Sequence, residues 1–206
     1  MTSAMSGWEV AAVILALAYL LLAMKEKISC WYAAFASTAI YTFLFFDVHL
    51  FMESALQLYY LGMAVYGWWL WKKPANGKVE NEIHTWKLSQ HLAVITVTLL
   101  LTVISGTLLA KNTTAAMPFL DSFITWGSVI TTWMVARKVL ENWLYWIVID
   151  ALSVYVYFDR ELYLTAILFV LYVLLAVIGY FEWHKRHQCG NNKNNNKRRE
   201  PCLSNP

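Results

Sequence analysis

The chain has 206 residues, of which 59% are hydrophobic, 16% aromatic and only 14% charged. Soluble domains carry about 25% charged residues, so this composition excludes an ordinary soluble protein and predicts an integral membrane protein. The three cysteines are too few and too scattered for a disulfide framework.

Long apolar runs follow one another along the chain, over residues 8–24, 29–46, 50–71, 91–110, 119–136, 142–158 and 162–183. About 20 apolar residues cross a bilayer as a helix, and continuous apolarity favours helices over alternating strands. The sequence therefore predicts an all-α membrane protein with seven transmembrane helices. We further expect a cytoplasmic loop and linker helix over 74–112 and a disordered basic tail over 186–206.

The positions of the basic residues predict the orientation. With the N-terminus outside, 14 of the 16 Lys and Arg residues lie in cytoplasmic segments, and only Lys111 and Arg160 lie outside. Basic residues near span ends are retained in the cytoplasm, so the C-terminus is expected there. The net charge of +3 thus reflects topology and requires no nucleic-acid partner.

An internal repeat emerges when the chain is shifted along itself, without gaps, so that Trp31 falls on Trp143. At this one offset, which we call the repeat offset, the identical pairs also include Asp47 with Asp159, Tyr60 with Tyr172, Gly67 with Gly179 and Trp71 with Trp183. Three-helix units can be parallel only if an odd helix separates them, so we expect a 3+1+3 arrangement with units over 8–73 and 119–185. Transporters with parallel repeats bind substrate near the midplane between them, although a repeat also fits a purely structural bundle.

The sixth span carries an acid at membrane depth. Asp150 lies at its centre, where a charged residue costs about 2.5–3.5 kcal/mol on insertion scales. At 100° per residue, it shares one helix face with Asn142, Trp146, Ser153 and Tyr157. The face could serve helix packing, but a substrate or ion contact is the favoured interpretation.

The third span has a second polar and aromatic stripe that includes Glu53, Gln57, Tyr60 and Trp68. Its counterpart in the seventh span has Thr and Phe in place of Glu53 and Gln57, and ends at Trp183. Each tryptophan alone is most simply an interface anchor. Together, aromatic rings beside amides and a carboxylate suit a flat ring, cationic or neutral, that carries hydroxyl groups. No Lys or Arg lies within a span, so we expect phosphate esters to be rejected.

Several functions lack their required residues. The seventh span has no buried lysine for a retinal Schiff base, and no hydrolase motif or phosphate-binding glycine loop is present. His184 and His187 could ligate a metal, but a solvated basic terminus is the better interpretation. We therefore expect no enzyme activity, no metal and no cofactor.

The motifs Gln57-Leu-Tyr-Tyr60, Tyr66-Gly-Trp-Trp-Leu-Trp71 and Glu141-Asn-Trp-Leu-Tyr-Trp146, with Asp150, resemble the PnuC family of bacterial vitamin transporters. The resemblance covers residues 8 to 185. It implies a shape similar to the SWEET sugar transporters, a homotrimer in the bacterial inner membrane, and uncoupled facilitated uptake of nicotinamide riboside. It also implies that Gln57, Tyr60, Asn142, Trp146 and Asp150 line the site.

Three alternatives remain open from the sequence. Family relatives carry thiamine or riboflavin, which also have flat rings and hydroxyl groups. Proton-coupled uptake could use Asp150 as the proton carrier. A seven-helix sensor or receptor also fits the expected orientation, although its cytoplasmic loops would be short.

Overall fold

The computed structural model describes residues 7–47, 51–72, 82–113 and 116–195. Seven helices make up nearly all of these residues: α1 (Gly7–Met24), α2 (Cys30–Asp47), α3 (Phe51–Lys72), α4 (Leu88–Asn112), α5 (Pro118–Ala136), α6 (Asn142–Asp159) and α7 (Tyr163–Asn195). In the described ranges no named strand occurs. The first six helices begin and end within three residues of the predicted spans, because long apolar runs mark transmembrane helices strongly.

The last helix corrects one prediction. α7 continues to Asn195, so residues 186–195 are helical and do not belong to a disordered tail. The extension is held by tertiary contacts, because His187 Nδ1 bonds the Ile83 carbonyl at 2.8 Å and Arg186 donates to the Lys25 carbonyl at 3.3 Å. The rest of the predicted tail, 196–206, lies outside the described residues.

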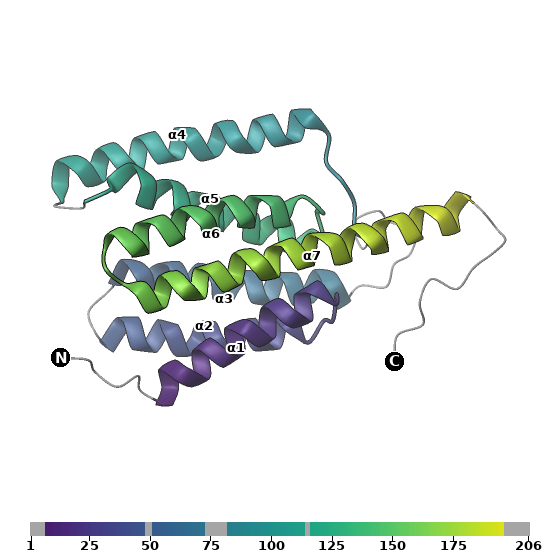
Figure 1. Cartoon of the computed structure of the whole chain (residues 1–206), viewed down its shortest axis with the longest axis horizontal. Helices are drawn as coiled ribbons and strands as arrows, with labels where there is room; N and C mark the ends of the chain where they lie inside the picture. The colour runs from purple at the N-terminus through teal and green to yellow at the C-terminus, as the bar shows by residue number, and fades with distance from the viewer. Residues whose placement is uncertain (1–6, 48–50, 73–81, 114–115, 196–206) are drawn as a thin grey trace.

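The helices form two sets of three with α4 beside them (Figure 1). α2 contacts both α1 and α3, and α6 contacts both α5 and α7. Between the sets, α3 contacts α5 and α1 contacts α7, while α4 lies along one edge of the bundle against α5. The repeat offset pairs α1 with α5 and α3 with α7. The contact of α3 with α5 is therefore equivalent to the contact of α7 with α1.

Two helix ends at equivalent positions of the repeat are built in the same way. After α1, Glu26 has φ 51°, and after α5, Lys138 has φ 55°. In each turn the following amide, of Lys27 or Val139, donates back across the helix end at 3.0 Å. This is the left-handed helix termination known as the Schellman motif.

Aromatic contacts recur at the same offset. Ring centroids lie 5.4 Å apart at 86° for Trp31 and Trp71, and 5.5 Å apart at 88° for Trp143 and Trp183. Trp31 covers Gly67, and Trp143 covers Gly179. Because glycine has no side chain, each ring can lie directly on the neighbouring helix backbone.

We call Trp31, Trp71, Trp143 and Trp183 the aromatic cluster. Two of its indoles join the first three helices to the last three. Trp71 Nε1 donates to the Ala136 carbonyl of α5, and Trp183 Nε1 donates to the Ala23 carbonyl of α1, each at 3.1 Å. The cluster lies where α1, α3 and α5 end. We call this the basic end, after Lys25, Lys27, Lys72, Arg137 and Lys138.

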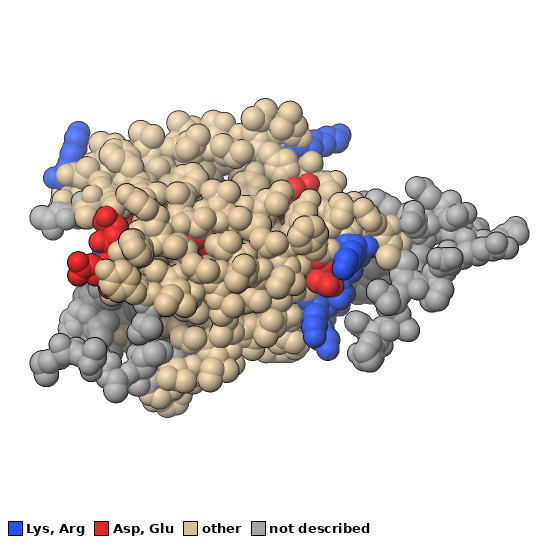
Figure 2. Space-filling model, viewed as in Figure 1, with Lys and Arg blue, Asp and Glu red and all other residues tan. Residues whose placement is uncertain are grey.

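The surface is apolar between charged ends. Figure 2 shows Lys, Arg, Asp and Glu gathered toward the two ends of the molecule, with a mostly uncharged band between them. Large apolar side chains such as Leu100, Val103 and Ile104 of α4 are exposed in that band. Two segments, Leu88–Asn112 and Thr165–Gly190, are by themselves long and apolar enough to cross a membrane. This distribution is typical of a membrane protein.

Candidate functional site

The predicted polar face of α6 points into the bundle. Asn142, Asp150 and Ser153 are buried, and Trp146 and Tyr157 are partly buried. The Ser153 hydroxyl donates to the Ile149 carbonyl of its own helix at 2.9 Å, and the Tyr157 ring stacks on Phe169 of α7 at 5.0 Å. The 3.6-residue periodicity thus located this face correctly.

Asp150 lies at the middle of this face. Its side chain is 6% exposed, and no hydrogen bond or ion pair joins its carboxyl group to another described residue. The carboxyl group of Asp150 and the hydroxyl group of Tyr41 in α2 both lie within electrostatic reach of the Tyr172 hydroxyl in α7. A buried carboxyl group without a donor is unfavourable, so a polar solute that donates hydrogen bonds would be stabilised beside it.

Asn142, at the first turn of α6, has half of its amide unpaired. Nδ2 donates to the Val139 carbonyl at 2.6 Å, whereas Oδ1 is buried without a hydrogen-bond partner in the described structure. Trp146, one turn further along, packs against two clusters of buried hydrophobic residues, one that includes Cys30 and Trp31 and one that includes Trp143 and Trp183. An unpaired buried acceptor beside an aromatic ring can accept a hydrogen bond from a ligand amide or hydroxyl.

The α3 stripe approaches α5. The Tyr60 hydroxyl faces Ser128 of α5, and the neighbouring Tyr59 hydroxyl donates to the Val129 carbonyl at 2.9 Å. Gln57, one turn from Tyr60, is partly buried. Glu53 belongs to α3, but its side chain lies outside the described residues. The structure therefore connects the α3 stripe to α5 through hydroxyl groups.

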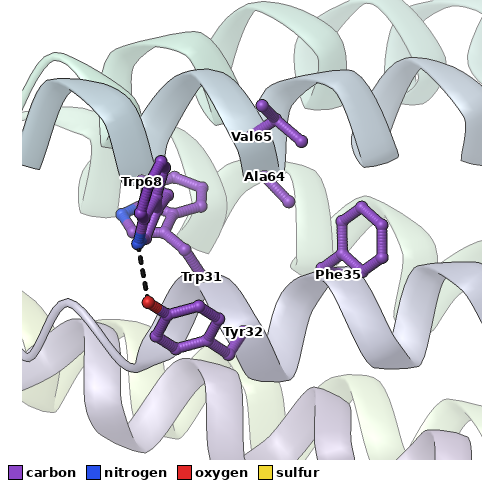
Figure 3. A pocket seen from close by; sticks show the side chains of 6 residues that line it. All are labelled: Trp31, Tyr32, Phe35, Ala64, Val65 and Trp68. Carbon is purple, nitrogen blue, oxygen red and sulfur yellow. Dashed lines mark hydrogen bonds between the residues drawn. The ribbon is translucent and has the colours of Figure 1, made fainter.

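Trp68 and Trp183 are held elsewhere by protein partners. Trp68 Nε1 donates to the Tyr32 hydroxyl at 2.9 Å, beside a cavity of about 320 Å³ between α2 and α3 (Figure 3). Trp183 is fully buried in the aromatic cluster of the basic end. No contact of the described residues joins either ring to Asp150, and both rings pack against other aromatic side chains.

Sequence reasoning missed several hydroxyl groups near these residues. Tyr19 of α1 lies within electrostatic reach of Tyr60, Ser128 faces Tyr60, and Tyr41 lies within electrostatic reach of Tyr172. The available signal was a hydroxyl group inside an otherwise apolar span. With Asp150 and Tyr172, these groups bring polar atoms from α1, α2, α3, α5, α6 and α7 into the interior.

A separate cavity of about 520 Å³ lies between α4, α5 and α6. At one side His91 Nδ1 lies 2.9 Å from the Tyr145 hydroxyl, and His91 Nε2 lies 3.9 Å from Glu141 Oε1. The α6 residues that line it, such as Tyr145 and Val148, face away from Asp150. Neither of these two cavities is lined by a predicted site residue of α6, so the candidate site rests on buried polar groups.

Three comparisons place the chain among known proteins. Residues 6–185 match the family model described as nicotinamide mononucleotide transporter. The chain is 26% identical over 188 residues to the nicotinamide riboside transporter PnuC of Escherichia coli K12, covering 79% of this chain and 78% of the relative. It is also 26% identical over 178 residues to the riboflavin/roseoflavin transporter RibM of Streptomyces davaonensis, covering 84% of this chain and 82% of the relative.

The fold resembles that in a crystal structure of the vitamin B3 transporter PnuC. The TM-score is 0.68 at 22% identity, and the match covers 87% of this chain and 81% of the other. This likeness supports the helical fold, and the family match extends over most of the chain. The chain belongs to the PnuC family, the family of nicotinamide mononucleotide transporters.

Proposed function

We propose that this protein carries nicotinamide riboside, an unphosphorylated vitamin precursor, across the bacterial inner membrane by uncoupled facilitated diffusion. The buried face of α6 carries the proposal. Asn142 Oδ1 is buried without a hydrogen-bond partner, and Asp150, a residue only 6% exposed, accepts no hydrogen bond in the described structure. A ribosyl nicotinamide offers hydroxyl and carboxamide donors to both and a flat ring to Trp146.

The proposed architecture is a 3+1+3 repeat, with units over 8–73 and 119–185 and α4 as the linker helix. It is supported by contacts that recur at the repeat offset, including the Trp–Gly pairs and the two left-handed turns. The basic end would face the cytoplasm and the N-terminus the outside, as the basic residues predict. Substrate would cross as the two three-helix units rock around the midplane.

The mononucleotide is a less suitable substrate by charge. The family description names it, but no Lys or Arg lies along the buried faces of α3 and α6. A phosphate moved into this interior would lack a cation to replace its hydration. We infer that the riboside is transported and its phosphate ester is excluded.

Riboflavin is the second candidate, and one observation favours it: the sequence identity to the riboflavin/roseoflavin transporter RibM, 26%, equals that to PnuC. Thiamine, proton coupling through Asp150 and a receptor role are weaker alternatives. We also infer a homotrimer, which light scattering of the detergent-purified protein would test.

Calorimetric titration of purified protein tests the site. Asn142→Ala and Gln57→Ala should each weaken riboside binding about five- to tenfold, the loss of roughly one hydrogen bond. Asn112→Ala is the matched control, because its amide bonds only its own helix at the exposed end of α4, at 2.8 Å from Leu108 O. Unchanged affinity in both site variants would refute the assignment. Tighter binding of riboflavin than of riboside would favour the second candidate.

A further inference from the structure

The turns that end α1 and α5 meet at the basic end. Lys138 Nζ lies 3.1 Å from Glu26 Oε2, and both side chains are mostly buried, at 12% and 20% exposed. Both residues have left-handed φ angles, 51° and 55°, and they are equivalent under the repeat offset. The proposed repeat therefore places equivalent turns face to face, and the two equivalent positions carry opposite charges.

Other contacts between the first three helices and the last three lie around this pair. We call this interface the seam. Arg186 Nη1 of α7 lies 3.9 Å from Glu26 Oε1, and Lys138 Nζ lies 4.9 Å from the centre of the Trp71 ring. The indole bonds from Trp71 to Ala136 and from Trp183 to Ala23 lie beside them. Each contact joins the first three helices to the last three, so all would break if the halves separated at this end.

From this geometry we propose that Glu26 and Lys138 form a latch that holds the basic end closed, and that its opening precedes release of substrate to the cytoplasm. The proposal rests on the rocking mechanism above and adds the residues that control one gate. Glu26 is the central residue of this latch, because its carboxylate lies beside both Lys138 and Arg186. Opposite charges at equivalent positions attract, whereas identical charges there would repel.

Cys30 provides a reporter for the latch. It is fully buried at the first turn of α2, clustered with Ala23 and Trp31 of its own half and with Val135 and Ala136 of the other. Lys138 acts on it electrostatically across the seam. A water-soluble maleimide can reach its thiol only after these halves part at the basic end.

The experiment measures the labelling rate of Cys30 in the otherwise cysteine-free C189S/C202S protein, in inside-out vesicles. Glu26→Gln keeps the side-chain length and Lys138→Gln shortens the side chain by one atom. Each removes one charge of the pair and should raise the rate about fivefold, the effect of weakening a partly buried ion pair. The double variant should exceed the faster single variant by little, because both changes remove the same interaction.

Arg160→Gln is the matched control. It removes the ion pair between Arg160 and Asp121, with Nη2 to Oδ2 at 2.7 Å, at the opposite end of the bundle. Its labelling rate should equal that of the parent protein. Unchanged rates in both latch variants, or an equal increase in Arg160→Gln, would overturn the latch.

Measuring riboside binding and transport beside the labelling rate distinguishes failure of the latch from failure of the proposed function. Labelling needs no substrate, so the latch stands if the variants react faster but riboside neither binds nor crosses. If riboside is transported and latch variants label at the parental rate, only the latch fails. Thermal unfolding midpoints near the parent's exclude general unfolding as the cause of faster labelling.

Discussion

Alanine at Gly67 or Gly179 should destabilise the protein by displacing a buried tryptophan. A Cβ built at Gly179 would lie 2.7 Å from ring carbons of Trp143, and one at Gly67 would overlap the Trp31 ring. Carbon atoms pack best at about 3.5–4.0 Å, so each ring would have to move by roughly 1 Å. Both rings are at most 2% exposed, and overpacking of this kind costs about 1–3 kcal/mol.

Gly62→Ala is the matched control, because no atom lies within 4 Å of a Cβ built there. All three variants gain about 1 kcal/mol of helix propensity, so the difference between them isolates the overpacking. Thermal unfolding in detergent, followed by tryptophan fluorescence, should give midpoints for G67A and G179A below that of G62A. Equal midpoints would show that the rings can move freely and would refute the close-packing argument.

Three further predictions concern named groups, and a fourth concerns substrate charge. Asp150→Asn should retain riboside uptake in liposomes, and an imposed pH gradient should change neither protein's rate; gradient-driven uptake lost in the variant would instead establish proton coupling. Trp71→Phe leaves the Ala136 carbonyl without its 3.1 Å donor and should lower stability by about 1–3 kcal/mol, measured by thermal unfolding. Tyr59→Phe removes the 2.9 Å bond to the Val129 carbonyl of α5 and should cost roughly 1 kcal/mol in the same assay. In a calorimetric comparison, the mononucleotide should give no binding heat at concentrations that saturate with the riboside.

The helices and the inward face of α6 were predictable from local patterns. Long apolar runs located the spans, and the 3.6-residue period put Asn142, Asp150 and Ser153 on one buried face. The end of α7 was not predictable in this way. The polar residues after Trp183 read as a solvated tail, because the contacts that hold them come from segments distant in sequence, such as Ile83.

The aromatic residues show what periodicity leaves open. Trp68 and Trp183 recur with the polar stripes, but a period does not say which neighbouring helix meets each side of α3 or α7. Trp68 meets Tyr32 beside the α2–α3 cavity, and Trp183 meets Trp143 at the basic end. The His91 and Tyr145 pair was missed for the same reason, since it depends on how α4 packs beside α5 and α6.

The positions that recur at the repeat offset and those that differ have distinct tasks in the proposed mechanism. Among the recurring ones, the Trp–Gly pairs and the left-handed turns lie toward the basic end, whereas the pairs Asp47 with Asp159 and Tyr60 with Tyr172 recur elsewhere in the helices. Three predicted site residues, Gln57, Asn142 and Asp150, differ from their counterparts Phe169, Cys30 and Thr38. Closing a gate between two equivalent units requires matching surfaces, which keeps their packing residues alike. A nucleoside has no twofold symmetry. Between the two three-helix units, each unit therefore contacts a different part of it, and the two units need different polar groups there.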